Sequence, residues 1–163
     1  MPKIKRKADD IPAGGLGFLS PQLHQNPLLG FGPNLCYVSA MIGKIKKLEK
    51  IATDEVDAVL AALPAPLAGP ARQVPVLFER LPDQELQESG IEADTLGLFT
   101  GPELAHEGDE PMPPQIILFL ENLWDEAEGD ERAFRNEVRI TYLHELGHYL
   151  GLDEDDLLER GLE

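Results

Sequence analysis

The chain of 163 residues, 42% of them hydrophobic, is long enough to form one domain with a modest core. It carries 30 acidic and 14 basic residues, a net charge of −16. A surface this acidic repels phosphate backbones, so we expect no nucleic acid partner. Cys36 is the only cysteine, which excludes an intrachain disulfide and a zinc–thiolate cluster.

The two parts of the chain differ in charge. Residues 1–50 hold eight Lys/Arg and three Asp/Glu (8 − 3 = +5), whereas residues 51–163 hold six and 27 (6 − 27 = −21). Because glycine and proline also interrupt the first 35 residues, we predict a basic, flexible extension over 1–50 and a folded domain over 51–163. The basic start lacks the apolar stretch of a signal peptide, and no run approaches the length of a membrane span. We therefore expect a cytoplasmic protein without a membrane partner.

The first predicted helix opens at Thr53, whose hydroxyl can cap the backbone, with acidic residues in the first turn. Apolar residues follow at helical spacing, and Pro64 ends the helix. The basic cluster before it, residues 44–50, is interpreted as a solvated stretch that leads into the helix.

Three segments are predicted to be strands. Residues 74–80 contain Pro75, which favours an edge position or the start of a strand. Residues 95–100 form a second short strand. Residues 115–120 (Gln-Ile-Ile-Leu-Phe-Leu) are the best strand in the chain, and if they formed the edge of the sheet they could hold an extended peptide by main-chain hydrogen bonds.

A second long helix is predicted to begin at Asp130, a favourable N-cap residue. Apolar residues on one face of this helix are expected in the core: Phe134, Val138, Tyr142, Leu146 and Tyr149. On the neighbouring face, Glu137 lies on the row that continues to His144 and His148. A solvated glutamate is the favoured interpretation of Glu137, and orientation of a ligand imidazole is the alternative.

Residues 144–148 read His-Glu-Leu-Gly-His, which is the signature of zinc hydrolases. On a helix, residues four apart differ by only about 40° around the axis, so His144 and His148 can bind one divalent ion together. Glu145 is not a ligand. Its carboxylate can act as general base on a water whose pKa the metal lowers towards neutrality.

A catalytic zinc usually takes a third protein ligand. Continuing the helix would carry residue 154 roughly 120° away from the histidines, but Gly151 can adopt the left-handed conformation that ends a helix and turns the chain. Residues 153–156 then supply four carboxylates, some of which are expected to cap a short last helix. The spacing alone leaves open which of them binds metal.

The spacing His144-Glu-x-x-His148-x-x-Gly151-x-x-Glu154 follows the metzincin pattern, with an acid at the place of the third ligand. From about Ala52 onwards the chain resembles the minimal zincins, a small bacterial zincin-like metallopeptidase family with a matrix-metalloprotease-like domain. The resemblance is carried by these segments in order: Ala-Ala-Leu-Pro, Val-Pro-Val-Leu-Phe-Glu, Leu-Gly-Leu-Phe-x-Gly, Pro-x-Gln-Ile-Ile-Leu-Phe and His-Glu-Leu-Gly-His-x-x-Gly-Leu.

This resemblance implies a compact α+β fold. A small mixed or antiparallel sheet would pack on an N-terminal helix and on the helix that carries the histidines, with a short C-terminal helix. The resemblance also implies that Glu154 is the third ligand. Because the family tends to have Asp at this position, Asp153 and Asp155 stay open as alternatives. The chain also departs from the metzincins in one respect, because no methionine follows the motif that could form their methionine turn.

The function that we predict is zinc-dependent hydrolysis of peptide bonds in a peptide or protein substrate. One Zn²⁺ per chain would be bound by His144, His148 and Glu154, with Glu145 as general base and later as proton donor to the leaving amine. The acidic body favours basic or neutral peptides.

Three side chains are considered as the group that stabilises the oxyanion, and none is assigned: Tyr142, Tyr149 and His106. Two other functions are also considered. The first is a metal-stabilised binding or regulatory domain with little turnover. The second is a metal-dependent endoribonuclease. Glu145 in the motif and the charge of −21 over residues 51–163 both argue against it.

Overall fold

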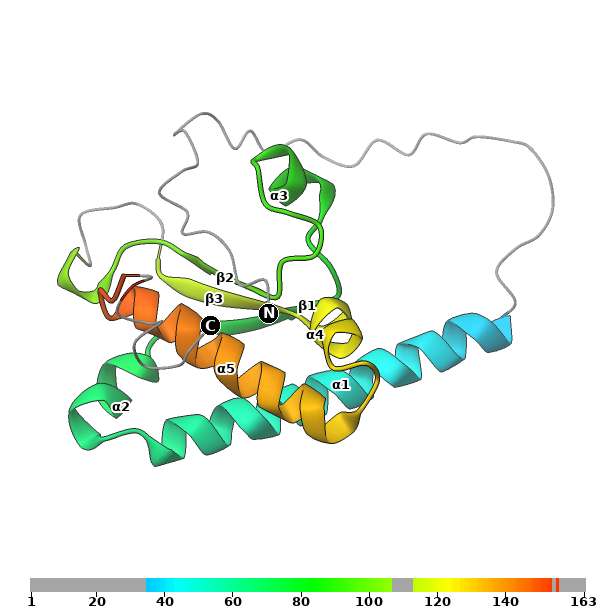
Figure 1. Ribbon diagram of the computed structural model, residues 1–163, viewed down its shortest axis with the longest axis horizontal. Coiled ribbons are helices and arrows are strands. Elements are labelled where there is room, and N and C mark those ends of the chain that lie inside the picture. The colour runs from blue at the N-terminus through cyan, green and yellow to red at the C-terminus, as the bar shows by residue number, and fades with distance from the viewer. Residues whose placement is uncertain (1–34, 107–112, 154, 156–163) are drawn as a thin grey trace.

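A three-stranded mixed sheet carries two long helices on one face (Figure 1). The computed structural model describes residues 35–106, 113–153 and 155. The strand order is β1-β3-β2, from β1 (Val76–Glu79), β3 (Gln115–Phe119) and β2 (Gly97–Thr100). Strand β1 pairs with β3 in parallel, and β2 pairs with β3 antiparallel. The α+β prediction, with a small mixed sheet, is confirmed.

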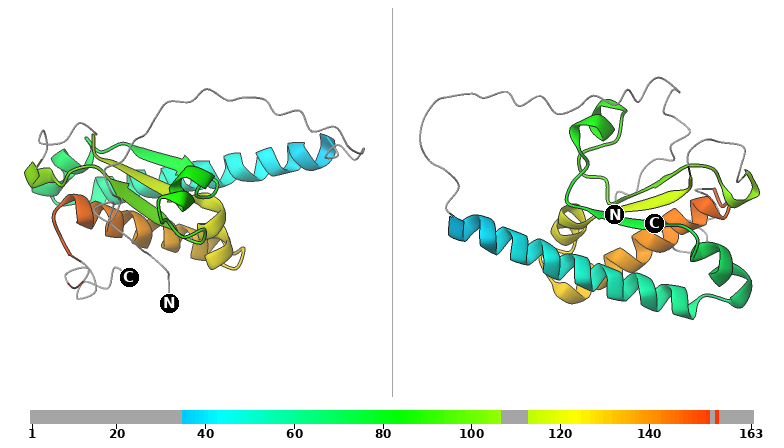
Figure 2. Two further views of the ribbon diagram at one scale, coloured as in Figure 1. Left: turned by 90° about the horizontal axis from the view of Figure 1, so that it is seen from above. Right: turned by 180° about the vertical axis from the view of Figure 1, so that it is seen from behind.

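The long helices are α1 (Leu35–Ala62) and α5 (Glu131–Tyr149). They cross each other on the same side of the sheet, as the view from behind shows (Figure 2). The other helical elements are short: α2 (Ala65–Ala71), α3 (Gln84–Glu88), the 3₁₀ turn η2 (Leu104–His106) and α4 (Leu120–Glu126). The predicted short C-terminal helix lies almost wholly outside the described residues. None of the helices in the described ranges combines the length and the apolar character that a membrane crossing requires.

All three predicted strands are present. The edge position that we considered for residues 115–120 as a peptide-binding strand was wrong. Strand β3 is the centre of the sheet, so its backbone is paired on both sides and cannot bind an extended peptide. The physical reason is its continuous apolar sequence, because a strand that is buried on both faces has no polar side. Strand β1 is an edge strand, as Pro75 predicted.

The predicted start of the first helix at Thr53 was also wrong. Helix α1 runs without interruption from Leu35, and the Thr53 hydroxyl donates to the carbonyl of Glu49 at 2.8 Å, one turn earlier. The apolar stripe of the helix continues upstream of Thr53, since Leu48 and Ile51 are both buried in the core. The helix therefore crosses the boundary that we predicted between the extension, 1–50, and the folded domain, 51–163. Residues 1–34 of the predicted extension lie outside the described part of the chain.

The two faces of the sheet bury separate sets of side chains. In β3, Ile116 and Leu118 face the helices and belong to the main core, whereas Ile117 and Phe119 belong to a smaller cluster on the opposite face. This alternation is the period of two that a strand imposes. The predicted stripe of α5 is confirmed as part of the main core: Phe134, Val138, Tyr142, Leu146 and Tyr149.

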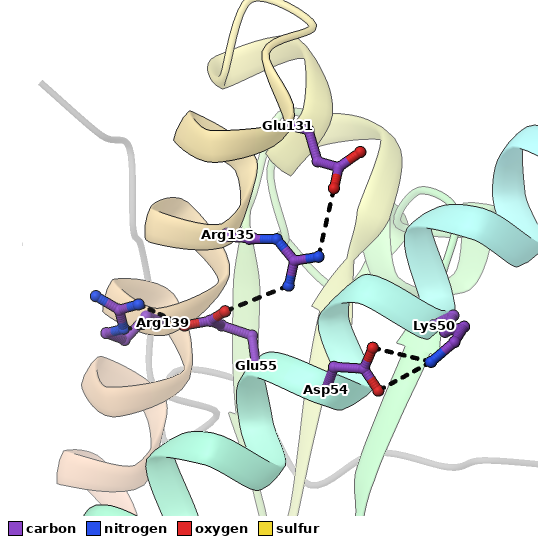
Figure 3. A network of polar contacts seen from close by, with 6 residues as sticks. All are labelled: Lys50, Asp54, Glu55, Glu131, Arg135 and Arg139. Atoms are coloured by element: carbon purple, nitrogen blue, oxygen red, sulfur yellow. Dashed lines mark hydrogen bonds and ion pairs between the residues drawn. The ribbon is translucent and has the colours of Figure 1, made fainter.

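An ion-pair cluster joins the two long helices (Figure 3). The nearly buried carboxylate of Glu55 on α1 accepts from Nε and Nη2 of Arg139 on α5, with the Nε contact at 3.1 Å. Arg135, one turn earlier on α5, lies 3.6 Å from the other Glu55 oxygen and 3.3 Å from Glu131. The cluster therefore adds a polar link between α1 and the helix that carries the histidines, beside their packing in the main core.

Replacing Glu55 by alanine should lower the free energy of unfolding by about 1 kcal/mol, because both arginines are partly exposed and regain water when the carboxylate is lost. We expect a fall in melting temperature of about 2–4 °C for a domain of this size. Asp54→Ala is the matched control, since Asp54 on the same helix pairs with Lys50 at an exposed position, at 2.9 Å. Equal melting temperatures for the two variants would contradict a role of Glu55 in linking the two helices.

Candidate metal centre and catalytic carboxylate

Helix α5 begins where the sequence predicted. Asp130 is its N-cap, and the Asp130 side chain accepts from the backbone N–H of Ala133 at 2.8 Å. Gly129 precedes it with a φ of 76°, a conformation that glycine adopts without strain. The helix ends at Tyr149, so residues 144–148 occupy its last turns.

His144 and His148 converge in the interior of the protein. They are only 3% and 4% exposed, and their Nε2 atoms lie 3.0 Å apart. The two rings are nearly perpendicular, with centroids 4.7 Å apart. Two imidazole nitrogens bound to one tetrahedral zinc at about 2.0–2.1 Å would be about 3.3 Å apart, so this pair fits a single zinc ion.

Glu145 stands beside the histidines and is equally buried, at 3% exposure. The start of the edge strand β2 passes directly against it. A Cβ atom placed on Gly97 would lie 3.0 Å from both Cγ and Oε1 of Glu145, and 2.5 Å from Cγ2 of Thr141. The fold thus brings an edge of the sheet to the carboxylate that we predicted as general base.

The chain reverses immediately after the histidines, as predicted. Gly151 has a φ of 82°, the left-handed conformation. The N–H of Leu152 donates to the carbonyl of Gly147, and that of Gly151 to His148, both at 3.0 Å. These two bonds form the Schellman motif that ends a helix. The carboxylate of Glu103 also reaches this turn, with Oε2 3.4 Å from the place of a Cβ on Gly151.

The third ligand stays a prediction. Glu154 lies outside the described residues, and Asp153 and Asp155 are exposed. Over residues 35–106, 113–153 and 155, no third His, Cys, Asp or Glu joins the two histidines in a group that could hold a metal ion. The donors that the structure describes are therefore the two imidazoles.

The two tyrosines considered for the oxyanion both belong to the core. Tyr142 is fully buried and points away from His144, since positions two apart on a helix differ by about 200°. Its hydroxyl has no hydrogen-bond partner among the described residues, and burial raises the pKa of Tyr142 to about 12. Tyr149 is buried against Phe99, with ring centroids 6.0 Å apart. Neither hydroxyl is therefore supported as a group that stabilises the oxyanion.

Glu137 is partly buried on the row that leads to the histidines. Burial raises the pKa of the Glu137 carboxyl, and the negative charge of Glu126 raises it further. One of its oxygens is buried without a hydrogen-bond partner in the described part of the chain. Glu137 is therefore only partly solvated, with one carboxylate oxygen buried, and its alternative role in orienting a ligand imidazole stays a prediction.

Because folding raises the pKa of Glu137 above the unfolded value of 4.5, its contribution to stability is present below pH 4.5 and is lost as the pH rises through the folded pKa. Glu137→Gln should therefore raise the melting temperature at pH 7, and the gain should vanish below pH 4.5. The control is Glu131→Gln. Because Lys47 and Arg135 lower the pKa of Glu131, this substitution should lower the melting temperature at pH 7 instead of raising it. Melting curves between pH 4 and 7 decide, and a loss of stability in Glu137→Gln at pH 7 would contradict the prediction.

One close neighbour of the site was not identified from the sequence. Gly97 lies in the Leu-Gly-Leu-Phe segment that resembles the family, and an isolated glycine inside a strand pattern is a general signal of close backbone approach. What it approaches could not be read from the sequence, because Gly97 and Glu145 are 48 positions apart.

Two converging buried imidazoles near the end of helix α5, with a buried carboxylate on the intervening sequence, lie beside a strand of a small mixed sheet. This arrangement is the one that the zincin class of proteins would require. The family model described as zincin-like metallopeptidase matches residues 71–162, more than half of the chain, and the protein belongs to this family. The predicted family is thereby confirmed, and its description as metallopeptidase points to a metal-dependent hydrolase. No curated protein matches the chain.

Proposed function

We propose that the protein is a zinc-dependent peptidase. The observation that carries the proposal is the buried pair of Nε2 atoms 3.0 Å apart, with the equally buried Glu145 on the next helix position. Family membership supports the same reaction class. His144 and His148 would hold the zinc ion, with Glu154 as the proposed third ligand.

Zinc, when bound, would supply a Lewis acid that lowers the pKa of water to about 7 and polarises a carbonyl group. The role of Glu145 is then to move a proton. Its carboxylate would take a proton from the attacking water and deliver it to the amine that leaves. A buried position suits this role, because few water molecules compete for the carboxylate.

The substrate would bind at strand β2 rather than at β3. Within the described residues, β2 has β3 as its only strand neighbour, and it begins against Glu145. The side chains of Leu98 and Phe99 belong to the two hydrophobic clusters, and all four residues of β2 are buried. An extended peptide would therefore have to gain access to the backbone groups on the outer side of β2. The charge of −21 over residues 51–163 favours basic or neutral peptides over acidic ones.

Removal of zinc is the experiment that tests this function. The purified protein should contain about one zinc ion per chain and should cleave members of a library of basic and neutral quenched-fluorescence peptides. A chelator should stop cleavage, and added zinc should restore it, because the metal supplies the Lewis acid. A zinc-loaded protein that cleaves no peptide would instead identify a metal-stabilised binding domain.

A further inference from the structure

The closest approach between the sheet and helix α5 occurs at Gly97. A Cβ atom there would lie 2.5 Å from Cγ2 of Thr141, well inside van der Waals contact. It would also lie 3.0 Å from Cγ and from Oε1 of Glu145. Three side-chain atoms thus occupy the space that any residue other than glycine would need at this position.

Hydrogen bonds on the segment before β2 and pairing with β3 oppose movement of the strand away from the helix. The side-chain amide of Asn122 on α4 donates to the carbonyls of Ala93 at 2.8 Å and of Thr95 at 2.7 Å, directly before β2. The backbone N–H of Phe119 donates to the carbonyl of Leu96 at 2.9 Å. Antiparallel pairing then sets Gly97 opposite Leu118, in the centre of the sheet.

The helix cannot yield easily either. Thr141 is fully buried, and as a β-branched residue on a helix it has few alternative rotamers. The Glu145 side chain has more torsional freedom, so it would also give way to a methyl group at position 97, by a few tenths of an ångström, once the contact with Thr141 is relieved. Even a small shift would move the carboxylate away from the position that the fold now gives it.

We propose that Gly97 is a positioning residue for Glu145, because its missing side chain leaves the space in which the carboxylate stands between the edge strand and the helix. The catalytic part of this inference rests on the proposed peptidase function. The steric part does not, since it concerns contacts between two residues of the folded chain.

The steric part is tested by unfolding measurements on the zinc-loaded protein. The Thr141→Ser background removes Cγ2 and with it the shortest contact. In this background Gly97→Ala should lower the melting temperature clearly when Glu145 is present, and much less when Glu145→Ala has removed Cγ and Oε1. If Gly97→Ala lowered the melting temperature equally with and without the Glu145 side chain, positions 97 and 145 would not contact each other, and the proposal would be overturned. Gly43→Ala is the control, since nothing lies within 4 Å of a Cβ there.

The catalytic part is tested by kcat and KM for a peptide that the wild type cleaves. Gly97→Ala combined with Thr141→Ser should keep its zinc content and KM, while kcat falls at least about tenfold relative to Thr141→Ser alone. A simple packing role would predict that the double variant regains the kcat of Thr141→Ser, and that result would overturn the proposal. If the wild type cleaves no peptide, the proposed function fails, and the unfolding measurements still decide whether Gly97 positions Glu145.

Discussion

Replacement of Glu145 by glutamine is expected to lower kcat for peptide hydrolysis by about 100- to 10,000-fold, the usual contribution of a general acid–base group. The substitution keeps the size of the side chain and removes only its ability to accept a proton. Because Glu145 is 3% exposed and stands beside the two histidines, no other described carboxylate replaces it from the same helix turn. The measurement is kcat and KM on a peptide that the wild type cleaves, together with zinc content.

The zinc content and KM of Glu145→Gln should stay near those of the wild type, since we do not place Glu145 among the ligands. Glu85→Gln, an exposed acid on α3, is the matched control and should change neither kcat nor zinc content. Undiminished cleavage by a zinc-loaded Glu145→Gln would exclude Glu145 as the general base. Loss of zinc from this variant would instead make Glu145 a ligand or a support of the metal site.

Replacement of His148 by alanine should weaken zinc binding by more than about 100-fold, which is the upper end of the loss seen for partners that only orient a ligand. The reason is that His148 supplies one of the two nitrogens that converge at 3.0 Å, and no third donor group is present among the described residues. The measurement is metal content by mass spectrometry, with a competing chelator to obtain the affinity. Retention of zinc by His148→Ala would contradict the two-histidine site.

The same assay can identify the third ligand. Glu154→Ala should lose zinc to a similar extent, whereas Asp153→Ala and Asp155→Ala should keep it. If Glu154→Ala keeps its zinc and one of the two aspartate variants loses it, the third ligand is that aspartate. Loss in none of the three would mean that the two histidines bind the ion without an acid from this segment.

Several local features of the site could be predicted from the sequence because they depend on residues near one another in the chain. The interval of four between His144 and His148 places them on one face of a helix, and the structure confirms their convergence. Asp130 caps the helix and Gly151 reverses it, since each acts on backbone groups within a few residues. The apolar runs likewise identified the three strands of the sheet.

The predictions that failed concern choices that a local pattern leaves open. A continuous apolar sequence indicates a strand that is covered on both faces, but it does not tell whether the strand is central or at an edge of the sheet. Only the pairing with β1 and β2 showed that β3 is central. A threonine such as Thr53 can cap the start of a helix or lie within one, so the sequence alone does not decide where the helix begins. Burial of Leu48 shows that α1 begins upstream of Thr53.

The sequence by itself determined the family, the two histidines and the catalytic role proposed for Glu145, because these depend on a spacing within one helix. Only the tertiary structure decided which strand forms the edge beside Glu145 and which residue makes room for its carboxylate. The physical reason is that Gly97 and Glu145 meet through strand pairing and helix packing. Such contacts depend on which surfaces are buried together, and no periodicity within either segment encodes them.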